Sequence, residues 1–161
     1  MIKSYQKKYV IICVLTFVVG FVLFIATTNQ SPSNNNLLAG KNAVVYRSVT
    51  CGCCANFIKY LRKAGVQVEE KLTENMATIK QQFGVPDNLK SCHTTRIENY
   101  TVEGHIPSEV IQKLLTEKPD IDGIALPGMP SGSPGMPGGK IGTFDISSFN
   151  ADGTSLPYLS F

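Results

Sequence analysis

The sequence contains a dense group of cysteines, Cys51, Cys53 and Cys54, within four consecutive positions. Cys51 and Cys54 form a C-x-x-C motif, and Cys53 adds a third sulfur beside them. Thiolates are the ligands that copper(I), zinc and iron–sulfur clusters prefer. Where such a motif opens a helix, the helix dipole and the free backbone N–H groups stabilise the thiolate and lower its pKa. The motif therefore predicts either a soft-metal site or a redox-active dithiol.

A second group of candidate ligands lies about forty residues further along the chain, where Cys92 and His93 are adjacent. A second histidine, His105, stands in the sequence Glu103-Gly104-His105-Ile106-Pro107. A lone histidine before a helix is commonly a hydrogen-bonded or exposed residue, so His105 is the weaker candidate. We expect Cys92 and His93 to complete a site with the first three cysteines.

The segment 127–142 has an unusual composition, with four prolines and six glycines in sixteen residues. The tetrapeptide Pro-Gly-Met-Pro occurs in it twice and presents Met129 and Met136. Glycine permits sharp turns and proline fixes φ, so a shaped loop is expected. The soft thioether sulfur suits copper(I), which makes both methionines candidate ligands. The alternative is that these methionines pack on the core.

The elements that must position these residues follow from hydrophobic patterning. Cys54, Phe57, Ile58 and Leu61 fall at the i, i+3, i+4, i+7 spacing of one buried helix face. The predicted strands are 43–48, 66–72, 94–98 and 100–103, and helices are expected to follow Cys51, Thr73 and Ile106. Short strands are also expected near 143–148 and 155–160.

The predicted order is β-α-β-α-β-β-α with a C-terminal extension, which is the order of the thioredoxin-like fold. Strand–helix–strand at the start implies a parallel pair with a right-handed crossover. In that fold the loop before the third strand packs beside the C-x-x-C motif. Ordinary members carry a cis-proline there, whereas this chain carries Cys92-His93. The fold class therefore predicts that the two groups of ligands meet.

The N-terminal residues predict export of the domain. The segment 9–26 contains no charge and no proline, and it is just long enough to span a bilayer core as a helix. Lys3, Lys7 and Lys8 precede it, so the positive-inside rule leaves the N-terminus in the cytoplasm. An inner-membrane anchor over 1–26 is favoured over a cleaved signal segment, and both place the domain outside the cytoplasm. Polar residues 27–42 predict a flexible linker, followed by one domain over 43–161.

The whole chain excludes some classes of function. It has 161 residues, a formal net charge of +3 and no tryptophan. No basic stripe is interleaved with aromatic residues, so nucleic acid is not an expected partner. The sequence has neither a Gly-x-Ser-x-Gly motif nor a phosphate-binding loop.

Three alternatives compete with the copper hypothesis. A structural disulfide framework is disfavoured because any bridge among Cys51, Cys53 and Cys54 closes a tiny loop and removes little entropy from the unfolded chain. A thiol–disulfide oxidoreductase would use C-x-x-C on this fold in the usual way. A structural zinc module would suit the residue types, although its ligand pairs are usually spaced more regularly.

Four motifs occur in the order found in a known family: Cys-Gly-Cys-Cys at 51–54, Ser-Cys-His-Thr at 91–94, Glu-Gly-His-Ile-Pro at 103–107, and the Pro-Gly-Met run at 127–136. In these motifs the chain resembles the CopG-type copper-resistance proteins, catalogued as domain of unknown function 411. The resemblance covers roughly residues 43–161. The chain departs from the family pattern in two ways. Members typically carry an aromatic residue such as tryptophan soon after the cysteine cluster, where this chain has Ala55-Asn56-Phe57, and many have a cleavable signal, whereas this apolar segment resembles an anchor.

The resemblance implies a thioredoxin-like fold, an exported location and copper binding through these cysteines. It also implies a role in copper tolerance, by sequestration, handover to a partner protein, or redox cycling of copper. The expected ligands are Cys51, Cys53, Cys54, Cys92, His93, His105, Met129 and Met136. Several thiolates in one site can bridge more than one copper(I) ion, and a binding role is favoured over an enzymatic one.

Overall fold

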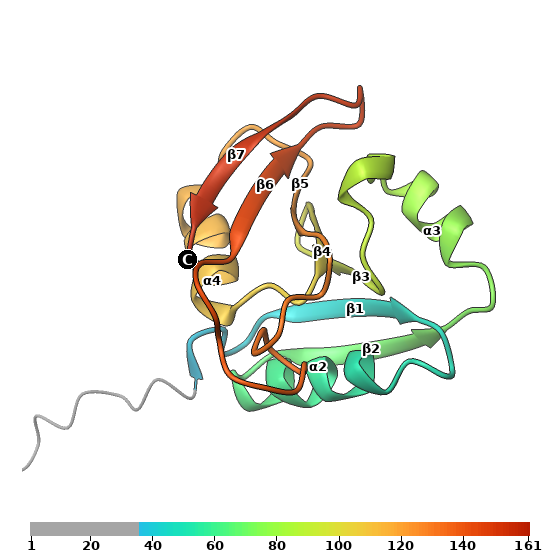
Figure 1. Ribbon diagram of the computed structural model, residues 1–161, viewed down its shortest axis with the longest axis vertical. Helices are drawn as coiled ribbons and strands as arrows, with labels where there is room; N and C mark the ends of the chain where they lie inside the picture. Colours follow the sequence, from blue (N-terminus) through green and yellow to red (C-terminus); the bar gives the residue numbers. More distant parts are fainter. Residues whose placement is uncertain (1–35) are drawn as a thin grey trace, which may run out of the picture. The chain divides into compact units, whose positions relative to one another are not determined.

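The computed structural model describes residues 36–161 (Figure 1). The predicted membrane segment over 9–26 and most of the predicted linker over 27–42 lie outside these residues. Within residues 36–161, no helix combines the length and apolar character needed to cross a membrane.

The described chain has a mixed α/β fold with three α-helices and seven strands. Its elements are β1 (Asn42–Arg47), α2 (Gly52–Lys63), β2 (Gln67–Leu72), α3 (Met76–Gln82), the 3-10 helix η2 (Asp87–Leu89), β3 (Thr94–Ile97), β4 (Tyr100–Gly104), α4 (Ser108–Glu117), β5 (Gly123–Leu126), β6 (Asp145–Phe149) and β7 (Ser155–Ser160). The order up to α4 is the predicted one. The thioredoxin-like class itself stays a prediction.

All seven strands form one sheet in the order β2-β1-β3-β4-β5-β6-β7. β1 and β2 are parallel, as predicted for a strand–helix–strand unit, and β4 and β5 are also parallel. The other neighbouring strands are antiparallel. β5 was not expected from the sequence, because its four consecutive buried residues show no alternation. The C-terminal extension therefore widens the sheet by three strands, β5, β6 and β7.

Helices cover both faces of the sheet. α2 buries Cys54, Phe57, Ile58 and Leu61, the face predicted from the sequence, and packs in one core with β1 and α4. α3 contacts β1 from the opposite side to α2 (Figure 1). A smaller apolar cluster, which includes Val85, Leu89 and Phe149, lies beside η2. Because α2 follows β1 directly, its N-terminus lies at the end of β1 where the cysteines are.

Two details of the folded domain differ from the sequence-based expectation. Leu38 lies in the predicted linker, yet it is buried in the main core and its N–H donates to the Ala64 carbonyl at 2.9 Å. Met76, Ile79 and Phe83, which the hydrophobic pattern after Thr73 places inward, are only partly buried, and the buried side chain of α3 is Lys80. A lysine can be buried there because an acidic partner lies opposite it, which a helical pattern of apolar residues does not reveal.

Candidate metal and thiol site

The N-terminus of α2 presents the first three cysteines. Cys51 is the N-cap residue, and its Sγ accepts a hydrogen bond from the Cys54 N–H at 3.3 Å. Cys51 and Cys54 form a disulfide whose Cα atoms are 5.4 Å apart. Cys53 and Cys92 are the free thiols of the described residues, and Cys53 Sγ lies 3.4 Å from Cys51 Sγ. The first turn of the helix therefore gathers three sulfur atoms at one point.

The spacing of the cysteines disfavoured a structural disulfide framework in this group, and the bridge that forms joins the two cysteines of the C-x-x-C motif. The argument from loop entropy holds, because a loop this short gives little stabilisation. Geometry nevertheless permits the bond, since one helical turn brings the two Cα atoms within the usual range for a disulfide. The bridge is thus better understood as the oxidised form of a C-x-x-C motif than as a disulfide that stabilises the fold.

Cys92 brings the second segment against the first. The segment 91–93 precedes β3, which pairs with β1, so it lies beside the chain that leaves β1 for α2. The Sγ atoms of Cys51, Cys53, Cys54 and Cys92 all lie within 4.8 Å of one another. The structure therefore brings together the four cysteines that the sequence assigned to one site.

Cys92 also belongs to a second group of donors. A nitrogen from each of His93 and His105 and the Cys92 Sγ lie within 4.8 Å of one another. His105 Nε2 is 3.0 Å from Cys92 Sγ, and His93 Nδ1 is 3.3 Å from it. The two imidazole centroids are 4.8 Å apart in an edge-to-face arrangement. Cys92 thus joins a group of four sulfurs to a pair of histidines.

His105 is oriented so that one nitrogen faces the thiols. Its Nδ1 lies 2.6 Å from the carbonyl oxygen of Pro134, which can only accept, so we assign the proton to Nδ1. Burial lowers the pKa of His105, which favours the neutral ring and leaves the Nε2 lone pair directed at Cys92. Metal-binding histidines usually have this arrangement, in which a carbonyl fixes one nitrogen and the other is free to coordinate. The weaker sequence candidate therefore has ligand-like geometry.

His93 is fully buried, and its Nε2 has no hydrogen-bond partner. Burial, then the neighbouring His105 and then Lys80, hold the pKa of His93 well below its usual value, so the ring is neutral. Buried polar atoms without a partner are rare in native proteins. A neutral imidazole in a thiol-rich pocket fits a soft or borderline metal ion.

Cys92 is a partly buried free thiol. Burial first, and then the proximity of Cys53, raise the pKa of Cys92 to about 12. Cys92 is therefore a neutral thiol in the metal-free protein and a poor nucleophile.

Phe57 supports the pair of histidines from α2. Its ring is fully buried, with its centroid 4.4 Å from that of His93 and 5.6 Å from that of His105. Sequence analysis assigned Phe57 to the core only, because periodicity does not show which side chains an inward residue meets.

Replacing Phe57 with alanine is expected to lower the free energy of unfolding by about 3–5 kcal/mol, because a large buried side chain leaves a cavity. Chemical denaturation of the metal-free protein measures this loss. Ile141→Ala is the control, since Ile141 is 84% exposed and its truncation should cost little. A loss no larger than that of the control would show that Phe57 is not an essential part of the core.

The loop between β5 and β6, orange in Figure 1, reaches α2. Gly135 has φ +85° and packs so closely that a Cβ there would lie 2.6 Å from Phe57 N and 2.9 Å from Cys53 O. Met129 is 41% exposed and Met136 is partly buried. The loop therefore covers the site through Pro134 and Gly135, while thioether ligation by Met129 and Met136 stays a prediction.

We expect Gly135→Ala to displace this loop from α2 and to cost about 1–3 kcal/mol, because alanine is strained at positive φ and would clash with the helix backbone. The shift should also break the bond between Pro134 and His105, which NMR of the imidazole protons detects. Gly139→Ala is the matched control in the same loop, since a Cβ at Gly139 meets nothing within 4 Å. Unchanged imidazole signals in Gly135→Ala would contradict the close contact.

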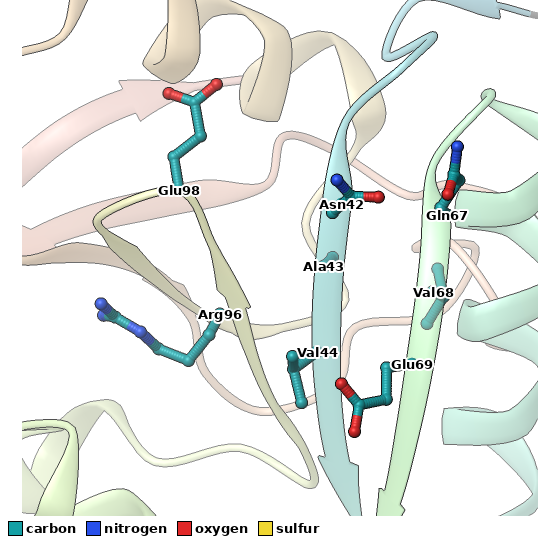
Figure 2. Close-up of a pocket in the computed structure, with 8 residues that line it drawn as sticks. All are labelled: Asn42, Ala43, Val44, Gln67, Val68, Glu69, Arg96 and Glu98. Atoms are coloured by element: carbon teal, nitrogen blue, oxygen red, sulfur yellow. The ribbon is translucent and has the colours of Figure 1, made fainter.

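A separate surface cavity of about 560 Å³ lies over β1, β2 and β3 (Figure 2). Val44, Glu69 and Arg96 are neighbours in register there, on the face of the sheet away from α2. Its lining contains neither a thiol nor an imidazole. The cavity is therefore not part of the thiol site.

Sequence reasoning missed two residues near the site, Lys80 and Glu103, which form a buried ion pair. The signal was present for Lys80, which falls at position i+4 from Met76 on the inward face of α3. A lysine at an inward position implies a buried acidic partner, but the sequence does not say which one.

Comparisons with known proteins agree with this geometry. The family model described as "Protein of unknown function, DUF411" matches residues 89–136. Two solved structures are similar to the chain, titled "Copper resistance protein copG- Form 2" and "Copper resistance protein copG- Form 1". No curated protein matches the sequence.

The first of these structures is 36% identical to the chain with a TM-score of 0.69, and the alignment covers 75% of this chain and 98% of that one. The second is also 36% identical with a TM-score of 0.68, covering 74% and 96%. Each alignment extends over almost the whole of the known structure. The chain therefore belongs to the family of CopG-type copper-resistance proteins.

Proposed function

We propose that this protein binds copper(I) at the joined thiol and imidazole site and acts in copper tolerance. The observation that carries the proposal is the position of Cys92, which lies in both groups of donors. Cys92 lies beside the three other sulfurs and beside both imidazoles, and together these groups form a donor set suited to a soft ion. Family membership supports a copper-related role.

The donor set can hold more than one ion. A single copper(I) ion does not need six protein ligands, and thiolates can bridge neighbouring ions. Cys92 is placed to bridge because it lies between the four-sulfur group and the imidazoles. We therefore propose that several copper(I) ions share the site, with Met129 or Met136 as additional ligands from the covering loop.

We also propose that the domain acts outside the cytoplasm. The uncharged segment 9–26 with lysines before it supports an inner-membrane anchor and a periplasmic domain. The Cys51–Cys54 disulfide is compatible with this location, since disulfides persist in oxidising compartments. The element order up to α4 supports a thioredoxin-like description of the domain.

Redox chemistry is the second candidate function, and the disulfide is the observation that favours it. When the Cys51 and Cys54 thiols close to the disulfide, they release two electrons and two protons. Two copper(II) ions could each accept one of these electrons and become copper(I). Mixing the reduced, copper-free protein with copper(II) without oxygen tests this, with thiol counts and a copper(I) chelator as readouts.

The experiment that tests copper(I) binding is an anaerobic titration of the full, reduced chain in detergent against a competing copper(I) chelator. We expect tight uptake of more than one ion per chain, and X-ray absorption should show a shell dominated by sulfur. Binding no tighter in the wild type than in the Cys51→Ser plus Cys54→Ser variant would reject the proposed site. Strong zinc uptake without copper(I) uptake would favour a structural zinc module instead.

A further inference from the structure

Lys80 and Glu103 form an ion pair beneath the candidate site, with side-chain exposures of 6% and 0%. Removing two charges from water is costly, and the attraction between them often does no more than offset that cost. A buried pair of this kind is therefore weak support for stability alone, and the contacts of its members become the important question.

Glu103 holds the residues on either side of Cys92 and His93. Its Oε1 accepts a hydrogen bond from the backbone N–H of Ser91 at 2.6 Å, and its Oε2 accepts one from the Thr94 hydroxyl at 2.7 Å. Lys80 Nζ donates to the Thr94 Oγ1 at 3.3 Å and to Glu103 Oε1. One carboxylate thus fixes both ends of the tetrapeptide that carries two candidate ligands.

The residues after Glu103 hold the middle of the same tetrapeptide. The Gly104 N–H donates to the His93 carbonyl at 3.1 Å. A Cβ at Gly104 would lie 2.7 Å from Ser91 Oγ, so the two chains are in close contact. His105 contacts the remaining residue, Cys92, through its Nε2. Segment 103–105 therefore contacts each of the four residues of segment 91–94.

We propose that Glu103, anchored by Lys80, is a positioning residue that fixes the Cys92–His93 pair against the thiols of α2 before any metal binds. The inference deepens the proposed copper function and rests on it. Residues that orient metal ligands through hydrogen bonds often matter almost as much as the ligands themselves. Lys80 balances the Glu103 charge, so the carboxylate can be buried beside the neutral imidazoles.

The test compares two double variants of the full chain, Lys80→Met with Glu103→Gln and Lys80→Met with Glu103→Leu. Both remove the two charges together, so neither leaves an unpaired buried charge. Glutamine retains an oxygen that can accept from the Ser91 N–H, whereas leucine does not. The control is Lys41→Met with Glu98→Gln, an exposed ion pair at the other end of β1 and β3.

Two readouts separate positioning from a merely structural role. The first is copper(I) affinity by chelator competition, which should fall about 10–100-fold in the leucine variant and stay close to wild type in the glutamine variant. The second is the rate at which iodoacetamide alkylates Cys92 relative to Cys53 in the reduced, copper-free protein. A released segment should expose Cys92 and raise this ratio in the leucine variant only.

Several outcomes would overturn the proposal. Wild-type affinity and an unchanged Cys92-to-Cys53 ratio in the leucine variant would show that the pair does not position the segment. Equal acceleration of both thiols, with a lowered free energy of unfolding, would assign the pair to general stability. If the wild type binds no copper(I), the proposed function fails, yet the alkylation ratio still decides whether Glu103 holds the segment.

Discussion

Serine in place of Cys92 is expected to weaken copper(I) binding by at least about a hundredfold, which is the upper end of what loss of a supporting residue costs a metal site. It should have the largest effect of any single cysteine change. Cys51, Cys53 and Cys54 each belong to one group of donors, whereas Cys92 belongs to both. A serine hydroxyl is a hard ligand and cannot replace a thiolate toward copper(I).

The variant should also lower the number of copper ions bound, because the imidazoles lose the sulfur that connects them to α2. Anaerobic titration of the reduced full chain gives both affinity and stoichiometry. The fold should tolerate the change, since serine is close in size and the site is only partly buried at Cys92. Circular dichroism and chemical denaturation verify this before the titration.

Cys13→Ser is the matched control, because Cys13 lies in the N-terminal apolar segment and is not a candidate ligand. Its copper(I) affinity and stoichiometry should equal those of the wild type. Replacing Cys53 with serine should have an intermediate effect. A Cys92→Ser variant that binds as well as Cys13→Ser would show that the two groups of donors do not act as one site.

The sequence could predict how the two halves of the site come together, because local patterning was unambiguous. Cys54, Phe57, Ile58 and Leu61 defined one helix face, and the strand before it placed the cysteines at a helix N-terminus. The element order then implied that the segment before the third strand lies beside them. This step needed only the order of elements and no side-chain detail.

What the sequence could not predict depends on contacts between distant residues. Lys80 pairs with Glu103 across 23 positions, and Pro134 bonds to His105 across 29. The inward position of Lys80 implies an acidic partner, but nothing local identifies Glu103 as that partner. Pro134 has no signature at all, because a hydrogen bond to a backbone carbonyl does not require a particular residue type. The buried strand β5 and the buried Leu38 were missed for a related reason, since short apolar stretches gain their structure from tertiary packing.

The second large effect is expected from the oxidation state of the C-x-x-C motif. While the Cys51–Cys54 disulfide is closed, two of the four sulfurs are not thiolates and cannot coordinate in the usual way. The oxidised protein should therefore bind fewer copper(I) ions and bind them more weakly than the reduced protein. Cys53, Cys92 and the imidazoles should retain only weak binding.

To measure this, the full chain is oxidised, the state of each cysteine is verified by alkylation and mass spectrometry, and copper(I) is titrated without oxygen or reductant. The same titration follows reduction and removal of the reductant. We expect reduction to restore both the stoichiometry and the affinity of the site.

The double variant Cys51→Ala plus Cys54→Ala separates this effect from other consequences of the reductant. It cannot form the disulfide, so its weak binding should be the same before and after reduction, close to that of the oxidised wild type. Equal binding by oxidised and reduced wild type would mean that Cys51 and Cys54 are not copper ligands. In that case the candidate site would shrink to Cys53, Cys92 and the two histidines. Whether Cys51 and Cys54 belong to the copper site is therefore decided by whether opening their disulfide changes the amount of copper(I) that the protein binds.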